Sequence, residues 1–196
     1  MLLSRRSLIS SLALLEVVGM DRASAQVGLP PAVDLGIMNI PQQGPEWCWL
    51  AVSQEIILWK RGGQSPSQCQ MASLADHFPA AVCCWPPPNV TIAQVCGRGG
   101  TLPEIQALIA RFGATFSQIT PPTDPMTLYQ VLKAGHPVVV ALQATPYAGH
   151  VVVVRGMEWL VGGVVLFVND PMSYFTQPVP FQNLVLLHWD AGIIVW

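Results

Sequence analysis

Residues 41–51 read Pro41-Gln42-Gln43-Gly44-Pro45-Glu46-Trp47-Cys48-Trp49-Leu50-Ala51. A loop rich in glycine and proline gives way here to apolar residues at helical spacing, which continue to Lys60 and stop before Gly62. Cys48 therefore lies at the predicted start of a helix spanning residues 46–60. The unpaired amides and the dipole of a helix N-terminus stabilise an anion, so this position favours a reactive thiolate.

The cysteine count separates Cys48 from the others. The chain has five cysteines, and four of them fall between residues 69 and 96: Cys69, Cys83, Cys84 and Cys96. In an exported protein these four are expected to form two disulfides, which leaves Cys48 as a free thiol. The adjacent Cys83 and Cys84 should bridge in different directions, to Cys69 and Cys96 in one of the possible pairings. A zinc site that includes His77 is the second interpretation, although the spacing lacks the Cys-x-x-Cys knuckle.

The N-terminus has the pattern of an export signal. Arg5 and Arg6 precede an apolar run over residues 8–15, and Ala23-Ser24-Ala25 has the small-x-small form of a cleavage site. Residues 4–9 also resemble a twin-arginine signal. The apolar run is too short to span a membrane. We therefore predict a signal peptide over residues 1–25 and an exported protein, periplasmic or secreted.

Residues 26–196 are predicted to form a single domain, and we expect a monomer. Only 10% of the residues are charged, against about a quarter in typical soluble domains. The sequence contains no basic run or stripe, which argues against a nucleic-acid partner.

The order of elements favours an α+β fold. Helices are expected over 46–60, 101–111 and 124–135, with short helices held by the disulfides between 64 and 100. Thr101 and Glu104 form a predicted capping box. β-strands are then expected over 137–142, 150–157, 164–169, 183–189 and 193–196, and Gly162-Gly163 predicts a hairpin. The helical part should therefore pack on a C-terminal antiparallel sheet.

A catalytic thiol needs a base, and His150 is the best candidate. It stands in Gly149-His150-Val151-Val152-Val153, where a small residue leaves room for a substrate and an apolar strand holds the ring. His136 is the weaker alternative. The group that orients the imidazole should come from the end of the next strand, where Asp170 is favoured over Asn169.

Acyl transfer also needs hydrogen-bond donors for the developing oxyanion. Gln42 lies six residues before Cys48, and its side-chain amide can act together with the Cys48 backbone amide. Gln43 remains an alternative donor. Trp47, Trp49 and Gly149, with the loop at Tyr147, are expected to line the substrate site.

Together these residues resemble those of a known family. The order Gln42, Cys48-Trp49, Gly149-His150 and Asn169-Asp170-Pro171 resembles the papain-like cysteine peptidases of clan CA. It is most similar to the compact bacterial branch that includes leader-processing peptidases and secreted effector proteases. Papain itself has an asparagine as its third catalytic member, whereas this chain offers an aspartate before proline.

The resemblance implies a papain-like fold and a role for each residue. Cys48 would be the nucleophile, His150 the general base and acid, Asp170 the orienting residue and Gln42 the oxyanion donor. It implies a thiol peptidase that acts on a protein or peptide substrate through an acyl-enzyme, without a metal or organic cofactor. The alternatives are a catalytically silent peptidase-like binding or toxin module, and a thiol acyltransferase.

Overall fold

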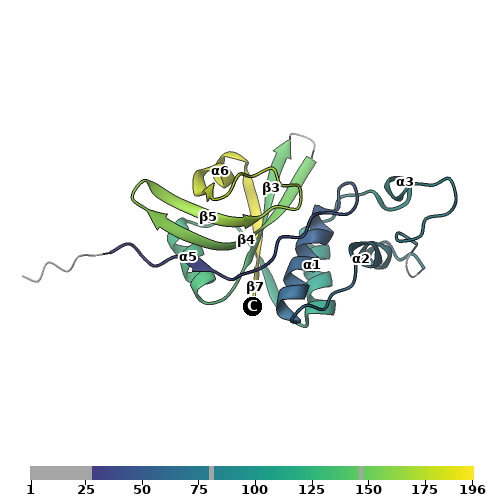
Figure 1. Ribbon diagram of the computed structural model, residues 1–196, viewed down its shortest axis with the longest axis horizontal. Coiled ribbons are helices and arrows are strands. Elements are labelled where there is room, and N and C mark those ends of the chain that lie inside the picture. The colour runs from purple at the N-terminus through teal and green to yellow at the C-terminus, as the bar shows by residue number, and fades with distance from the viewer. Residues whose placement is uncertain (1–27, 80–81, 146–147) are drawn as a thin grey trace, which may run out of the picture.

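The computed structural model describes residues 28–79, 82–145 and 148–196 (Figure 1). The predicted signal peptide and Tyr147 lie outside these ranges. Within them the chain forms a helical half followed by an antiparallel sheet, which confirms the expected α+β fold. None of the helices described is long and apolar enough to cross a membrane.

Helix α1 (Cys48–Lys60) is the central element of the helical half. Leu50, Val52, Ile56 and Ile57 are fully buried, because α1 is enclosed by other helices and by the sheet. The helix begins at Cys48, two residues after the predicted start. The chain beyond it turns at Gly62-Gly63, where both glycines have positive φ.

Three short α-helices and a π-helix complete this half, and each α-helix begins with a capping box. The elements are α2 (Gln68–Ala75), α3 (Ile92–Cys96), α4 (Leu102–Leu108) and the π-helix η1 (Ile109–Gly113). The predicted box of Thr101 and Glu104 at α4 is confirmed. The same pattern of a hydroxyl residue three positions before a glutamine precedes α2 and α3.

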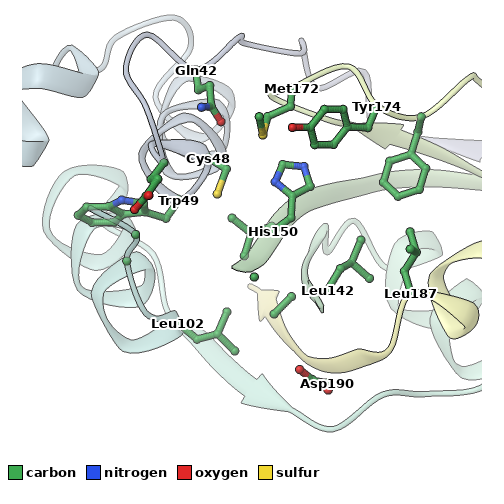
Figure 2. Close-up of a pocket in the computed structure, with 17 residues that line it drawn as sticks. Gln42, Cys48, Trp49, Leu102, Leu142, His150, Met172, Tyr174, Leu187 and Asp190 are labelled. Atoms are coloured by element: carbon green, nitrogen blue, oxygen red, sulfur yellow. The ribbon is translucent and has the colours of Figure 1, made fainter. Parts of the chain in front are cut away.

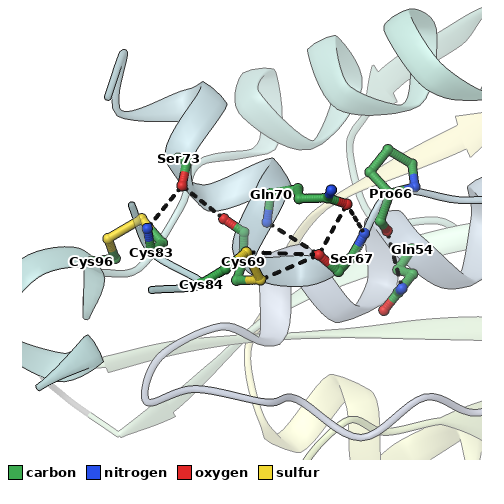
Figure 3. Close-up of a disulfide and its surroundings, with 9 residues drawn as sticks. All are labelled: Gln54, Pro66, Ser67, Cys69, Gln70, Ser73, Cys83, Cys84 and Cys96. Carbon is green, nitrogen blue, oxygen red and sulfur yellow. Dashed lines mark hydrogen bonds between the residues drawn. A yellow bond between two sulfur atoms is a disulfide. The ribbon is translucent and has the colours of Figure 1, made fainter. Parts of the chain in front are cut away.

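Two disulfides form, as predicted, and they tie α2 and α3 to the adjacent residues Cys83 and Cys84 between them (Figure 3). Cys69 pairs with Cys84, and Cys83 pairs with Cys96. The zinc alternative is excluded by this pairing, because every candidate sulfur is covalently bound. Asp76 lies close to the Cys83 and Cys96 sulfurs, but their disulfide removes both as metal ligands.

Seven strands form a single antiparallel sheet in the described part of the chain. Their order is β2-β7-β3-β4-β5-β6, and β1 pairs with β4. The strands are β1 (Val33–Asp34), β2 (Ser117–Thr120), β3 (Val138–Thr145), β4 (Ala148–Leu160), β5 (Gly163–Asn169), β6 (Val179–Pro180) and β7 (Trp189–Val195). The predicted hairpin joins β4 and β5.

Alternate residues of the sheet belong to two different cores. Val139 and Val153 pack with α1, whereas Val140 and Val152 pack with α5 (Pro125–Lys133) and α6 (Phe181–Leu186). In Figure 1, α1 and α2 accordingly lie on one side of the sheet strands and α5 on the other.

The strand predicted over 183–189 is wrong. Residues 181–186 form α6, and only Trp189 belongs to a strand. Phe181 and Leu184 are buried one helical turn apart, while Val185 and Leu186 are exposed. A short apolar run fits a strand or a helix equally well, and the spacing of buried positions decides for the helix.

Candidate active site

Cys48 is the first residue of α1 and the free cysteine of the described chain. It is half-buried, and no side chain caps the helix N-terminus at Trp47. The first backbone amides of α1 are therefore not occupied by a capping side chain. The Cys48 thiol therefore lies at a helix N-terminus, near the position that the sequence predicts.

Trp47 anchors the start of α1 and does not line the cleft. Its side chain is 1% exposed, and its indole Nε1 donates a hydrogen bond to the Cys96 carbonyl at 2.8 Å. Gly44 packs directly under the ring, where a Cβ atom would lie 2.6 Å from the indole. The expectation that Trp47 contacts substrate is therefore corrected, because the buried residue fixes the loop before Cys48 against the disulfide-linked segment.

His150 stands between Cys48 and Asp170. Its Nε2 lies 2.7 Å from Asp170 Oδ1, and the ring is only 4% exposed. Figure 2 shows the Cys48 sulfur pointing toward the His150 ring. The histidine comes from β4 and the cysteine from α1, so the pair joins the two halves of the fold.

The carboxylate of Asp170 is held by the loop that follows it. The backbone amides of Met172, Tyr174 and Phe175 donate to its two oxygens at 2.9, 2.5 and 3.2 Å. Burial alone would raise the pKa of Asp170, but the hydrogen bonds from His150 and from these amides hold it below its ordinary value. Asp170 therefore stays ionised at neutral pH.

The neighbours of His150 favour its protonated form. Burial lowers the pKa of the ring, but hydrogen bonds and charge interactions with Asp170 and Cys48 outweigh burial and raise the pKa to about 9. At neutral pH the ring is therefore an imidazolium that faces the Cys48 sulfur.

Asn169 does not contact His150. Its side chain accepts a hydrogen bond from Arg155 at 3.0 Å and donates to Glu55 at 3.1 Å and to the Ile37 carbonyl at 3.0 Å. Of the two candidates for the orienting group, the structure brings Asp170 to the imidazole.

Gln42 lines the cleft near Cys48, whereas Gln43 is exposed and does not. The Gln42 side chain donates one N–H to the Gly44 carbonyl at 3.0 Å, which leaves the second N–H for a ligand. Its backbone amide donates to the Pro171 carbonyl at 3.2 Å, next to Asp170. His136, the alternative base, packs against Trp196 with the two rings tilted, and it does not line the cleft.

The cleft around these residues has a volume of about 830 Å³. Trp49 and Gly149 belong to its lining, as predicted. Trp49 donates to the Arg98 carbonyl at 3.1 Å, and Gly100 packs so closely on its ring that a Cβ would lie 2.2 Å away. The remaining lining residues are Glu46, Gly99, Gly100, Leu102, Ala141, Leu142, Val151, Met172, Tyr174, Phe175, Leu187 and Asp190.

A model of the papain-like cysteine protease AvrRpt2 family matches residues 33–183 of the sequence. The chain belongs to this family. The match spans most of the described residues, from β1 into α6. A search of curated protein sequences found no match.

Solved structures of papain-like proteins share the fold of this AvrRpt2-family protein. A C39-like peptidase from Bacillus anthracis superposes with a TM-score of 0.60 at 16% identity, over 85% of this chain and 98% of that chain. Procathepsin L2 from the larval midgut of Tenebrio molitor gives a TM-score of 0.57 at 14% identity, over 87% and 69%. Procathepsin L 3 from the same tissue gives 0.54 at 14%, over 86% and 71%.

The sequence did not reveal the wall formed by Met172, Tyr174 and Phe175 in this family member. These residues follow Asp170 in a loop without regular spacing. Hydrogen bonds from their backbone amides to the Asp170 carboxylate hold them at the cleft. The Asp-Pro turn was a usable signal, because a carboxylate at a turn often binds the amides that follow.

Proposed function

We propose that the protein is an exported thiol peptidase that hydrolyses peptide bonds through Cys48, His150 and Asp170, with Gln42 as an oxyanion donor. One observation carries this proposal: the buried His150 ring binds Asp170 and also faces the Cys48 sulfur, at the edge of a cleft. The membership in a cysteine protease family supports the same activity.

The proposed reaction begins with attack of the Cys48 sulfur on the carbonyl carbon of the scissile peptide bond. The new C–S bond forms as the carbonyl electrons move to oxygen, which accepts hydrogen bonds from the Cys48 amide and the free N–H of Gln42. His150 then protonates the leaving nitrogen while the C–N bond breaks. A thioester on Cys48 and a free amine result.

Hydrolysis of the thioester reverses the role of His150. The neutral ring accepts a proton from water as the water oxygen attacks the thioester carbonyl, and the C–S bond then breaks. The products are a carboxylic acid and the Cys48 thiolate beside an imidazolium. Asp170 keeps the ring oriented throughout, because its own oxygens are fixed by three backbone amides.

Export is supported by the two disulfides. Such bonds persist in oxidising compartments and are rare in reducing ones. They agree with the N-terminal pattern of paired arginines, apolar run and small-x-small site.

Incubation of the protein with a diverse peptide library tests the proposed activity. The wild-type protein should cleave peptides and the Cys48→Ala variant should not, as measured by mass spectrometry. If the protein is a hydrolase, the new C-termini should be free acids even when an amine is added. Exclusive transfer of the acyl group to the added amine would instead assign the protein as an acyltransferase. Equal product formation by Cys48→Ala would overturn the proposal.

A further inference from the structure

A β-bulge places Asp190 at the cleft. In the β3–β7 pair, Leu142 lies opposite Trp189 and Ala141 lies opposite Ala191, so Asp190 is an extra residue between two paired positions. Bulges near active sites commonly redirect a side chain. Here Trp189 is buried, whereas Asp190 is exposed and lines the cleft.

The carboxylate of Asp190 has no polar partner among the described residues. No hydrogen bond or ion pair within these ranges involves it. Leu102 and Leu187 line the same cleft, and Figure 2 shows Asp190 on the side of His150 away from Gln42. An unpartnered carboxylate beside apolar side chains can accept a cation that also carries an apolar stem.

The charge of the cleft favours such a ligand. Glu46 is the second acidic residue in the lining, and no lysine or arginine of the described ranges lines the cleft. Arg98 lies over the Trp49 ring, but its guanidinium is paired with Asp76 at 2.5 Å and with Glu104 at 2.7 Å. The His150 imidazolium in the lining is paired with Asp170, so the carboxylates of Asp190 and Glu46 leave the cleft negatively charged toward a substrate.

We infer that Asp190 forms a subsite for a lysine or arginine side chain of the peptide substrate. The methylene stem would pack on Leu102 and Leu187, while the charged head pairs with the Asp190 carboxylate. This inference rests on the proposed peptidase function, because it assigns a substrate class to the same cleft.

Binding to the Cys48→Ala variant tests the subsite without requiring catalysis. The probes are three pools of hexapeptides in which one scanned position is lysine, norleucine or glutamate and the other positions are mixed. At one position the lysine pool should be retained about threefold better than the norleucine pool, as expected for an exposed charge pair. Equal retention at every position, or no retention of any pool, would overturn the inference.

Substitutions then identify the carboxylate. Adding Asp190→Asn should bring the ratio of lysine to norleucine retention to about one. Glu158→Gln removes an acid outside the cleft and should leave the ratio unchanged. The inference fails if Asp190→Asn has no effect, if Glu158→Gln has the same effect, or if Glu46→Gln alone abolishes the preference.

Hydrolysis by the protein with Cys48 intact separates the two proposals. If the lysine preference in binding depends on Asp190 but no peptide is hydrolysed, the subsite stands and the peptidase function fails. If peptides are hydrolysed without any lysine preference in binding, the peptidase function stands and the subsite fails.

Discussion

Asp170 accepts hydrogen bonds from the His150 ring and from three backbone amides of the following loop. The amides fix both carboxylate oxygens, so the carboxylate can orient the imidazole without moving itself. The same bonds bring Met172, Tyr174 and Phe175 to the cleft wall. One residue therefore links the electrostatics of the site to the shape of the cleft.

Replacement of Asp170 by asparagine should lower kcat/KM on the order of 100-fold, because the imidazole loses its orienting charge. The wild-type pKa of His150 is raised to about 9, so activity that needs the protonated ring should fall as pH rises through about 9. In Asp170→Asn this alkaline loss should begin at lower pH. Profiles of kcat/KM against pH measure both effects.

Glu158→Gln is the matched control for this experiment, since it also converts an acid to an amide and lies on β4 with His150. It should leave the alkaline limb where the wild type has it. An unchanged alkaline limb in Asp170→Asn would contradict the assigned role of the carboxylate.

The sequence predicted the residues whose chemistry is local and missed those whose position depends on remote contacts. Cys48 at a helix start and His150 at a strand start are recognisable from their immediate neighbours. The burial of Trp47 depends on Cys96, which is distant in sequence, and the exposure of Asp190 depends on a bulge in strand pairing. Neither the Trp47 hydrogen bond nor the bulge at Asp190 can be recognised from the neighbouring residues in the sequence.

At the scale of elements, Glu55 joins helix α1 to strand β5. It is 1% exposed, accepts from the Ile40 amide at 2.8 Å and accepts from the Asn169 side chain at 3.1 Å. Glu55 lies about two helical turns after Cys48, and Asn169 immediately precedes Asp170. These bonds therefore connect the helix that begins at Cys48 with the strand that ends just before Asp170.

Glu55→Ala should lower the free energy of unfolding by about 2 kcal/mol, because the buried Asn169 side chain and the half-buried Ile40 amide each lose an acceptor. Burial raises the pKa of Glu55 to about 8, against the hydrogen bonds from Ile40 and Asn169. Because the pKa of Glu55 in the folded state exceeds the ordinary glutamate value of 4.5, the stability of the wild type relative to Glu55→Gln should fall as pH rises from about 4.5 to about 8. Denaturant unfolding of the wild type and both variants at several pH values measures these free energies. A difference between the wild type and Glu55→Gln that does not change with pH would contradict the raised pKa.

The Cys83–Cys96 disulfide joins the segment before α3 to the last residue of α3, and its removal should destabilise the protein. The bond spans a sequence separation of 13, and closing a loop of this size stabilises by about 3 kcal/mol. A Cys83→Ala, Cys96→Ala double variant should therefore melt roughly 6–12 °C lower, for a domain of this size. Thermal unfolding without reductant measures the shift. Cys48→Ala is the control and should change Tm little. A double variant that melts at the same temperature as the wild type would contradict the expectation.

Elements with clear end signals were predictable from the sequence, and ambiguous apolar runs were not. Asp124-Pro125 and the Thr101–Glu104 capping box correctly predicted the starts of α5 and α4. The run at 183–189 has neither a helix-capping signal nor the alternation of a strand, so its pattern fits both, and the helix was wrongly predicted as a strand. The short strands β1 and β6 were missed because two residues carry no periodic signal.

At the scale of the whole molecule, the active site lies where the helical half meets the sheet. The two cores share the sheet, and alternate valines of β3 and β4 enter one or the other. The near-continuous valines at 138–140 and 151–154 are typical of strands buried on both faces. This pattern made the sheet predictable, whereas the strand order required long-range pairing that the sequence does not state.

Export predicts a processed N-terminus. Expression in a bacterium with an intact twin-arginine pathway should yield a periplasmic or secreted protein that begins at Gln26. N-terminal sequencing of the purified protein measures this. Replacing Arg5 and Arg6 by lysine should retain the unprocessed chain in the cytoplasm. A cytoplasmic wild-type protein with an intact N-terminus would contradict the proposal.

The rate of alkylation of Cys48 tests the central claim most directly, because it reports the activated thiol without any knowledge of the substrate. A free cysteine is only a few per cent thiolate at neutral pH, so the paired thiol should react with iodoacetamide at pH 7 about tenfold or more faster than glutathione. His150→Ala should reduce the rate to that of a free thiol, with the mass shift located at Cys48. A wild-type rate no greater than that of glutathione, or an unchanged rate in His150→Ala, would contradict the account.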